Sequence, residues 1–141
     1  METSTIHEGG CLCGAIRYRV TAAPTALVVC HCRTCRKAAG APSLAWAIFR
    51  MADFAFTRGE PATFASSPGV ERGFCARCGT TLTYADADRP DVADVTTATL
   101  DNPDAFAPTK EIWLDEKIAW EAVDHARARY PRSSRTSEPL P

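Results

Sequence analysis

The sequence predicts a mainly β fold of several small, bent antiparallel sheets with little helix. Three observations predict it. Many short runs of strand-forming residues alternate with Gly, Pro, Asp and Ser along the 141 residues. Only two stretches have any helical character. The seven cysteines, finally, fall into three tight clusters at which the chain must bend, so the small sheets are expected to form around cysteine-rich sites.

The expected elements begin and end at turn residues. The strands are rich in β-branched and aromatic residues and are expected at 15–20, 26–29, 44–49, 54–57, 62–65, 70–74, 80–84, 92–100 and 111–114. A helix of one or two turns is expected at 33–39, before Gly40. A second helix is conceivable at 118–129, although its apolar face is weak.

We expect one domain at residues 1–129 and a disordered tail at 130–141. A chain of this length buries enough surface to form a core without disulfides. From Tyr130 onward the sequence consists largely of Pro, Arg, Ser and Glu, a composition that is too poor in apolar residues to pack.

Composition points away from several classes of protein. The formal net charge is −1 and no long block of like charge precedes the C-terminal tail, so composition gives no support for nucleic-acid binding. No window approaches 18 apolar residues, so no membrane span is expected. Residues 1–8 lack the basic and apolar regions of a signal peptide. We therefore expect a cytoplasmic protein with reduced thiols that binds neither nucleic acid nor membranes.

The third cysteine cluster has the form of a zinc knuckle. Cys75 and Cys78 are separated by two residues and followed by Gly79, which can adopt the positive φ that such a turn needs. A knuckle supplies two of the four ligands of a closed tetrahedral site. The first cluster can supply the others, since Cys11 and Cys13 would share one face of an extended segment. These four cysteines are predicted to hold one structural zinc ion.

The second cluster then stands alone. Cys30, Cys32 and Cys35 lie within six residues and offer three ligands, the number typical of a catalytic zinc with one open position. Three thiolates weaken Lewis acidity, so this second zinc site is suited to activating a thiol. His31 could be a fourth ligand, or a packed histidine that orients its neighbours.

The three clusters together resemble those of the glutathione-dependent formaldehyde-activating enzymes, whose domain also occurs in centromere protein V. The matching stretches are 9–14, 30–37, 72–80, 99–103 and 112–113 with Trp120. The resemblance covers about residues 7 to 120. It implies a β-tent fold with one closed and one three-cysteine zinc site. It also implies a carbon–sulfur lyase that joins formaldehyde to glutathione, with Cys30, Cys32 and Cys35 holding the reactive zinc.

The resemblance implies small-molecule partners, a thiol such as glutathione and a small aldehyde. Basic residues near the clusters could bind carboxylates of the thiol or could be solvated surface: Arg33, Arg36, Lys37 and Arg72. Large aromatic residues are expected in the core rather than along a substrate wall: Trp46, Phe49, Trp113 and Trp120. Asp101 could be an acid or base, but Asp-Asn-Pro is first a turn signal.

Three alternatives to an enzyme of this kind remain open. Both zinc ions could be structural, which would make the chain a binding module. Cys32 and Cys35 could form a redox-active dithiol, although no βαβ pattern accompanies them. The cysteines could also be buried small hydrophobic residues. The clustering of all seven favours metal binding over this last alternative.

Overall fold

A computed structural model describes residues 5–141. As predicted, the protein is mainly β, with eleven strands and one α-helix among these residues. The chain forms two compact units. The first contains the residues up to Ala26 together with Ala47–Phe106, and the second contains Leu27–Trp46 and Ala107–Pro141. Strand β4 (Leu44–Arg50) carries the chain from the second unit back to the first.

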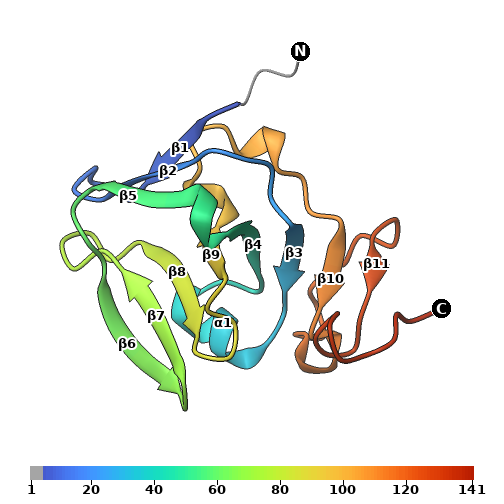
Figure 1. Ribbon diagram of the computed structural model, residues 1–141. Helices are drawn as coiled ribbons and strands as arrows, with labels where there is room; N and C mark the ends of the chain where they lie inside the picture. The colour runs from blue at the N-terminus through green and yellow to red at the C-terminus, as the bar shows by residue number, and fades with distance from the viewer. Residues whose placement is uncertain (1–4) are drawn as a thin grey trace. The chain divides into compact units, whose positions relative to one another are not determined.

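A three-stranded antiparallel sheet begins the first unit. Its order is β1 (His7–Gly10), β2 (Arg17–Val20) and β5 (Phe54–Arg58), and the three strands lie side by side in Figure 1. In β2 the side chains of Tyr18 and Val20 are fully buried, whereas Arg19 between them is exposed. This alternation is the period-2 pattern of a strand with one face toward the core.

A second set of antiparallel strands completes the first unit. Neighbours along the chain pair in the order β6 (Ala62–Ser67), β7 (Val70–Phe74), β8 (Thr81–Asp86) and β9 (Val92–Thr96). The core of the unit contains Tyr18, Val20, Phe49, Leu82, Val95, Leu100 and Phe106. The remaining short elements here are three 3₁₀ turns: η1 (Met51–Asp53), η2 (Thr97–Thr99) and η3 (Pro103–Ala105).

Gly9 allows β1 to pack closely on its neighbours. It lies opposite Tyr18 in the β1–β2 register and forms an isolated bridge with Leu100. A Cβ at this position would lie 2.5 Å from the Tyr18 ring and 2.6 Å from the carbonyl oxygen of Thr99. The Tyr18 hydroxyl and the Thr99 Oγ1 are hydrogen-bonded at 2.8 Å, so neither neighbour is free to move aside.

The second unit contains parallel strand pairs. Strand β10 (Lys110–Ile112) pairs in parallel with both β3 (Ala26–Cys30) and β11 (Ala128–Arg129), and Figure 1 shows the three strands side by side. In the β3–β10 register Ile112 lies opposite Cys30. The end of β10 is therefore next to the second cysteine cluster.

Helix α1 (Arg33–Ala39) follows β3 directly and confirms the predicted short helix. Cys32 caps its N-terminus, and Gly40 ends it in the left-handed region at φ 63°. Glycine is favoured at such a position because it has no Cβ to clash. The last turn carries Arg36 and Lys37, whose charge complements the helix dipole.

The prediction of a possible helix at 118–129 is wrong. Among the residues that follow the 3₁₀ turn η4 (Leu114–Glu116), the chain forms turns and then β11. The Lys117 ammonium donates to the carbonyl oxygens of Ile118 and Glu121, both at 2.8 Å. These carbonyls would otherwise accept helical amides, so the lysine and the weak apolar face together favour a turn.

Three other expectations are corrected. The strand expected at 92–100 ends at Thr96, and η2 begins because the Thr99 hydroxyl donates to the Thr96 carbonyl at 2.7 Å. Trp120 is 74% exposed and is not a core residue, whereas Trp46 and Phe49 are buried as expected. Strands β1 and β11 lie outside the expected set.

The segment after Arg129 makes backbone contacts to the second unit. The Tyr130 amide donates to the Glu111 carbonyl at 2.9 Å, and the Trp113 amide donates to the Arg132 carbonyl at 3.1 Å. Its disorder in solution stays a prediction, as does the expected domain boundary. Over residues 5–141, none of the helices has the length and apolar character needed to cross a bilayer.

Replacing Gly9 with alanine tests the close packing of β1. The new methyl group would overlap the Tyr18 ring and the Thr99 carbonyl, so we expect a loss of roughly 1–3 kcal/mol in the free energy of unfolding. Thermal and urea unfolding measure it. Glu8→Ala, on the exposed side of the same strand, should change stability far less. Equal stability of Gly9→Ala and the wild type would contradict this packing.

Candidate metal centres

The first cysteine cluster forms the turn of the β1–β2 hairpin. The Cys11 amide donates to the Ile16 carbonyl at 3.1 Å, and the Gly14 amide donates to the Cys11 carbonyl at 3.1 Å. Gly14 has φ 80°. Residues 11–14 are thus a tight turn and not the extended segment we expected. The curl of this turn, rather than strand alternation, brings Cys11 and Cys13 together, with 3.6 Å between their sulfurs.

The third cluster is the equivalent turn of the β7–β8 hairpin. The Cys75 amide donates to the Thr80 carbonyl at 3.0 Å, and the Gly79 amide donates to the Cys75 carbonyl at 2.8 Å. The Cys78 amide donates to the Cys75 sulfur at 3.4 Å. Gly79 has φ 80°, the value that the knuckle interpretation requires. Two hairpin turns therefore present two cysteines each.

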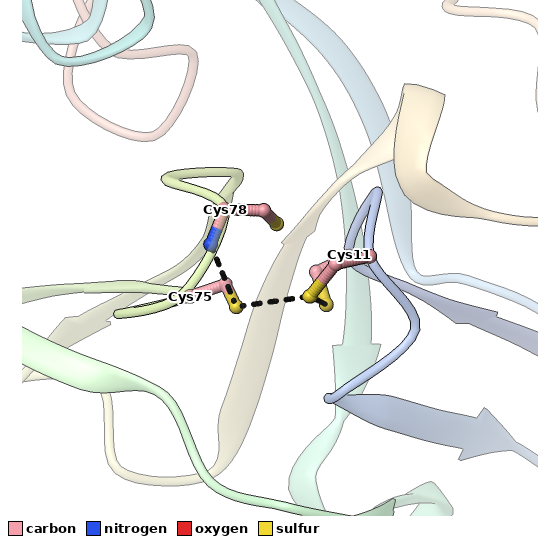
Figure 2. A group of neighbouring side chains, drawn as sticks. Cys11, Cys75 and Cys78 are labelled. Atoms are coloured by element: carbon pink, nitrogen blue, oxygen red, sulfur yellow. Dashed lines mark hydrogen bonds between the residues drawn. The ribbon is translucent and has the colours of Figure 1, made fainter.

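The four sulfurs of these turns converge on one point. All of them lie within 4.8 Å of one another, and the Cys13 and Cys75 sulfurs are 3.8 Å apart. Figure 2 shows the side chains of Cys11, Cys75 and Cys78 directed toward a common space. Sulfurs bound tetrahedrally at about 2.3 Å from a zinc ion lie about 3.8 Å apart. The donor set and its spacing therefore fit a tetrahedral metal ion.

Thr80 links the two turns. Its Oγ1 accepts a hydrogen bond from the Leu12 amide at 3.0 Å and lies 3.2 Å from the Cys78 sulfur. The hydroxyl can donate to a thiolate while it accepts from the amide. This hydrogen bond is the largest of the effects that lower the pKa of Cys78 to about 5. The lowered pKa favours the thiolate form of Cys78, which is the form that a metal ion requires.

The second cluster is assembled where β3 meets α1. Cys30 is the last residue of β3, Cys32 is the N-cap of α1, and Cys35 lies in the first helical turn. The Cys35 amide donates to the Cys32 sulfur at 3.3 Å. The three sulfurs lie within 4.8 Å of one another. A strand end, a cap and a helix thus bring three ligands from a single short segment together.

Hydrogen bonds within this cluster favour ionisation of Cys32 over that of Cys30. The hydrogen bond from Cys30, and to a lesser extent that from Cys35, lowers the pKa of Cys32 well below its ordinary value. The same interaction with Cys32 raises the pKa of Cys30. Cys30 and Cys35 are each only 4% exposed, whereas Cys32 is half-buried. Cys32 is therefore the most exposed of the three cysteines.

The two clusters differ in the number of ligands. Among residues 5–141, no histidine, aspartate or glutamate joins the three cysteines of the second cluster within the same range. His31 is instead buried, with its Nε2 2.7 Å from the Glu111 Oε1. This arrangement matches the interpretation of His31 as a packed histidine. Either cluster could bind a metal ion, and soft thiolate ligands are compatible with zinc.

The other candidate residues lie in different surroundings. Arg33 and Lys37 are exposed on α1, and the Arg36 Nε donates to the His31 carbonyl at 3.3 Å. Arg72 is 6% exposed, so it is neither solvated surface nor free to bind a substrate carboxylate. Its Nε donates to the Ser66 hydroxyl at 3.1 Å, and its guanidinium lies over the Tyr84 ring.

Asp101 lies in the first unit beside Arg17. The Arg17 guanidinium donates to both oxygens of its carboxylate, and this pairing lowers the pKa of Asp101. The interaction gives Asp101 a structural role at the bend after η2, in keeping with the turn signal. A carboxyl group whose pKa is lowered gives up its proton more readily and is ionised near neutral pH, so it is a poor general acid.

Sequence reasoning missed two polar residues of these sites, Thr80 and Glu111. A threonine after a glycine carries no signal that its hydroxyl will face a thiolate. Glu111 is 1% exposed, and its partner Arg127 follows sixteen residues later. A lone glutamate in a short strand is expected on the surface, so only the three-dimensional contacts identify it.

Two hairpin turns that hold four converging sulfurs, together with a separate group of three, define a β protein with two cysteine clusters that could each hold a metal ion. A family model, the glutathione-dependent formaldehyde-activating enzymes, matches residues 6–116. The chain belongs to this family. The match covers all seven cysteines, and it confirms the resemblance that the cysteine clusters predicted.

Similar proteins support this placement. A Halomonas elongata protein named "Putative glutathione-dependent formaldehyde-activating enzyme" is 31% identical over 142 aligned residues, which cover 90% of each chain. A Schizosaccharomyces pombe protein named as an uncharacterized lyase is 37% identical over 79 residues, covering 56% of this chain and 57% of the relative. This alignment thus spans little more than half of the yeast protein.

The fold also occurs in a solved structure. A crystal structure of a Rhodobacter sphaeroides protein superposes with a TM-score of 0.56 and 24% identity. The match covers 67% of this chain and 87% of the other. At this identity the comparison concerns the fold alone.

Replacing Thr80 with valine should change the pH dependence of metal binding at the four-cysteine cluster. Without the Thr80 hydroxyl, the pKa of Cys78 should rise from about 5 toward its ordinary 9.0. Between these two pH values, Cys78 of the variant must then lose a proton when metal binds. For each pH unit by which the pH is lowered, the metal affinity of the variant should therefore fall about tenfold more than that of the wild type. Zn²⁺ competition against a chelator from pH 6 to 9 measures this.

The control for that experiment is Thr63→Val, the same change at an exposed position of β6. It should leave the pH dependence unchanged. Identical slopes for Thr80→Val and the wild type would contradict the assignment of Thr80 as the donor to Cys78.

Proposed function

We propose that this chain is a zinc-dependent carbon–sulfur lyase that acts on a glutathione-like thiol and a small aldehyde such as formaldehyde. Its family and two relatives, one named as a lyase and one as a formaldehyde-activating enzyme, support an enzyme of this type. The observation that carries the proposal is the difference between the two clusters, four converging sulfurs in one and three in the other. A four-thiolate site is closed, whereas a three-thiolate site leaves a tetrahedral position for a substrate.

In this proposal Cys30, Cys32 and Cys35 form the reactive site. Zinc held there would favour the thiolate form of a substrate thiol and polarise a carbonyl oxygen. The chain itself contributes the arrangement of the three sulfurs: burial fixes Cys30 and Cys35, and the half-buried Cys32 lies on the accessible side. Arg33 and Lys37, exposed on α1 next to this cluster, could attract the carboxylates of the thiol.

The reaction joins the two substrates without an oxidant or reductant. The thiolate sulfur forms a bond to the aldehyde carbon, and the π bond of the carbonyl breaks toward oxygen. The proton released by the thiol ends on that oxygen, so the product is a hydroxymethyl thioether with the combined atoms of both substrates. The reverse reaction cleaves the carbon–sulfur bond, as the lyase class requires.

The four-cysteine cluster is proposed as the structural zinc site. An ion bound by Cys11, Cys13, Cys75 and Cys78 would join two hairpin turns separated by more than sixty residues of chain. Such a connection removes much of the freedom of the unfolded chain. In small zinc domains metal binding contributes on the order of 10 kcal/mol to folding. The proposal thus assigns two zinc ions to each chain, one structural and one catalytic.

The alternative is a binding module with two structural zinc ions. It would require a fourth protein ligand at the second cluster, and the described residues 5–141 place no histidine, aspartate or glutamate there. The open redox alternative would instead use Cys32 and Cys35. It predicts activity without zinc, which the experiment below also examines.

A matched pair of serine variants tests the proposal. Cys32 and Cys78 are both half-buried but belong to different clusters. Cys32→Ser should melt close to the wild type and lose at least about 100-fold of the protein-dependent rate, because one of three reactive ligands is gone. Cys78→Ser should melt far lower or fail to fold, because it opens the structural site.

The rate is measured as the loss of free thiol in mixtures of glutathione and formaldehyde, corrected for the spontaneous reaction. A protein without effect on that rate, for a range of thiols and aldehydes, would contradict the proposed activity. The reverse ranking of the two melting temperatures would contradict the assignment of the two sites. Full activity after removal of zinc would favour the redox alternative.

A further inference from the structure

A hydrogen-bonded chain of three polar side chains, two buried and one half-buried, lies beside the three-cysteine cluster in the second unit. His31, between Cys30 and Cys32, donates from Nε2 to the Glu111 Oε1 at 2.7 Å. The Glu111 Oε2 in turn accepts from the Arg127 guanidinium at 2.6 Å. His31 and Glu111 are each 1% exposed. A buried carboxylate is costly unless it is fully paired, so its position here requires an explanation.

The pairing fixes the side chain of His31. A carboxylate can only accept hydrogen bonds, so the histidine Nε2 must carry the proton. Because each carboxylate oxygen has its own donor, Glu111 cannot rotate without losing one of them. The His31 Nδ1 is also buried and has no hydrogen-bond partner among the described residues. The imidazole is therefore held entirely through Nε2.

The backbone of His31 is fixed as well. Its amide donates to the Ile112 carbonyl at 3.0 Å, and its carbonyl accepts from the Arg36 Nε at 3.3 Å. Glu111 and Ile112 are adjacent in β10, and this strand pairs with β3 up to Cys30. One strand thus holds both the main chain and the side chain of the residue that separates two of the three sulfurs.

We propose that Glu111 is a positioning residue for metal binding at the three-cysteine cluster, acting through His31. The residue does not touch the metal or substrate. It sets the orientation of the peptide between Cys30 and Cys32, and so the placement of their sulfurs. The inference rests on the proposed function, in that it assumes a metal ion at this cluster. It adds a residue of the chain that determines how tightly that ion is held.

The first test replaces Glu111 with glutamine in the full chain. A carboxamide has one accepting oxygen, so either His31 or Arg127 loses its acceptor. Affinity for Zn²⁺ at the three-cysteine cluster should fall about tenfold or more, the usual effect of groups that orient metal ligands. The four-cysteine cluster, in the other unit, should keep its affinity. Chelator competition yields both affinities, and Cys35→Ser identifies which one belongs to the three-cysteine cluster.

The second test is a double-mutant cycle. If Glu111 acts through His31, Glu111→Gln should cause little further loss in a His31→Phe background, because the hydrogen bond is already absent. His31→Gln keeps an N–H donor and should retain most of the affinity. Co²⁺ absorption spectra of each variant report the geometry at the cluster, which a merely destabilised fold would not change selectively. Glu121→Gln, the same chemical change in the same unit, is the control.

The outcomes separate this inference from the proposed function. A wild-type chain that holds only one metal ion contradicts both. Two ions in the wild type, with unchanged affinities in Glu111→Gln, overturn the positioning role alone. Additive losses in the cycle would also overturn it. If Glu111→Gln does not fold, Arg127→Lys serves as the second variant, because it keeps the charge but weakens the contact with Glu111. It should reduce Zn²⁺ affinity several-fold at the three-cysteine cluster only. An unchanged affinity in this variant would overturn the inference.

Discussion

Two hairpin turns of the first unit converge on four sulfurs, and this convergence constrains how the unit can fold. The β1–β2 turn and the β7–β8 turn come from distant parts of the chain, and each is curled by a glycine at φ 80°. Four thiolates at this spacing repel one another unless a cation lies between them. A bound cation would thus hold together two hairpin turns that, without it, repel each other through their thiolates.

The second cluster is held in place in a different way. Its three sulfurs come from one short segment, where a strand ends and a helix begins, so no long loop is closed when they bind an ion. Its order comes instead from the surrounding protein, namely the parallel pairing of β3 with β10 and the buried contacts of His31 with Glu111. This division is consistent with one ion that holds the fold and one that is free to take part in chemistry.

Much of this could be predicted from the sequence because cysteine spacing is an unusually specific signal. The β class, the short helix after Cys32 and the two groupings of cysteines all follow from local patterns. The reason given for Cys11 and Cys13 was wrong, since a turn and not a strand brings them together. The helix expected at 118–129 is wrong: its apolar face is weak, and the Lys117 ammonium donates to carbonyls of the turn that forms instead.

The polar contacts around the clusters could not be predicted, for a physical reason. Thr80 contacts Leu12, and Glu111 contacts His31, across most of the chain, and no periodicity marks a buried glutamate or a threonine hydroxyl that faces sulfur. Trp120 shows the converse, because a large aromatic residue is expected inside and is instead 74% exposed. Local pattern identifies the ligands, and only tertiary contact identifies what positions them.

Native mass spectrometry of the reduced full chain, with and without glutathione, tests the central claim most directly. The account predicts two zinc ions per chain, of which one remains in place while the other gains a bound thiol or is released when glutathione is added. A chain without zinc would contradict the account entirely. Two ions that are both indifferent to glutathione and to other small thiols would contradict the open, reactive site at Cys30, Cys32 and Cys35.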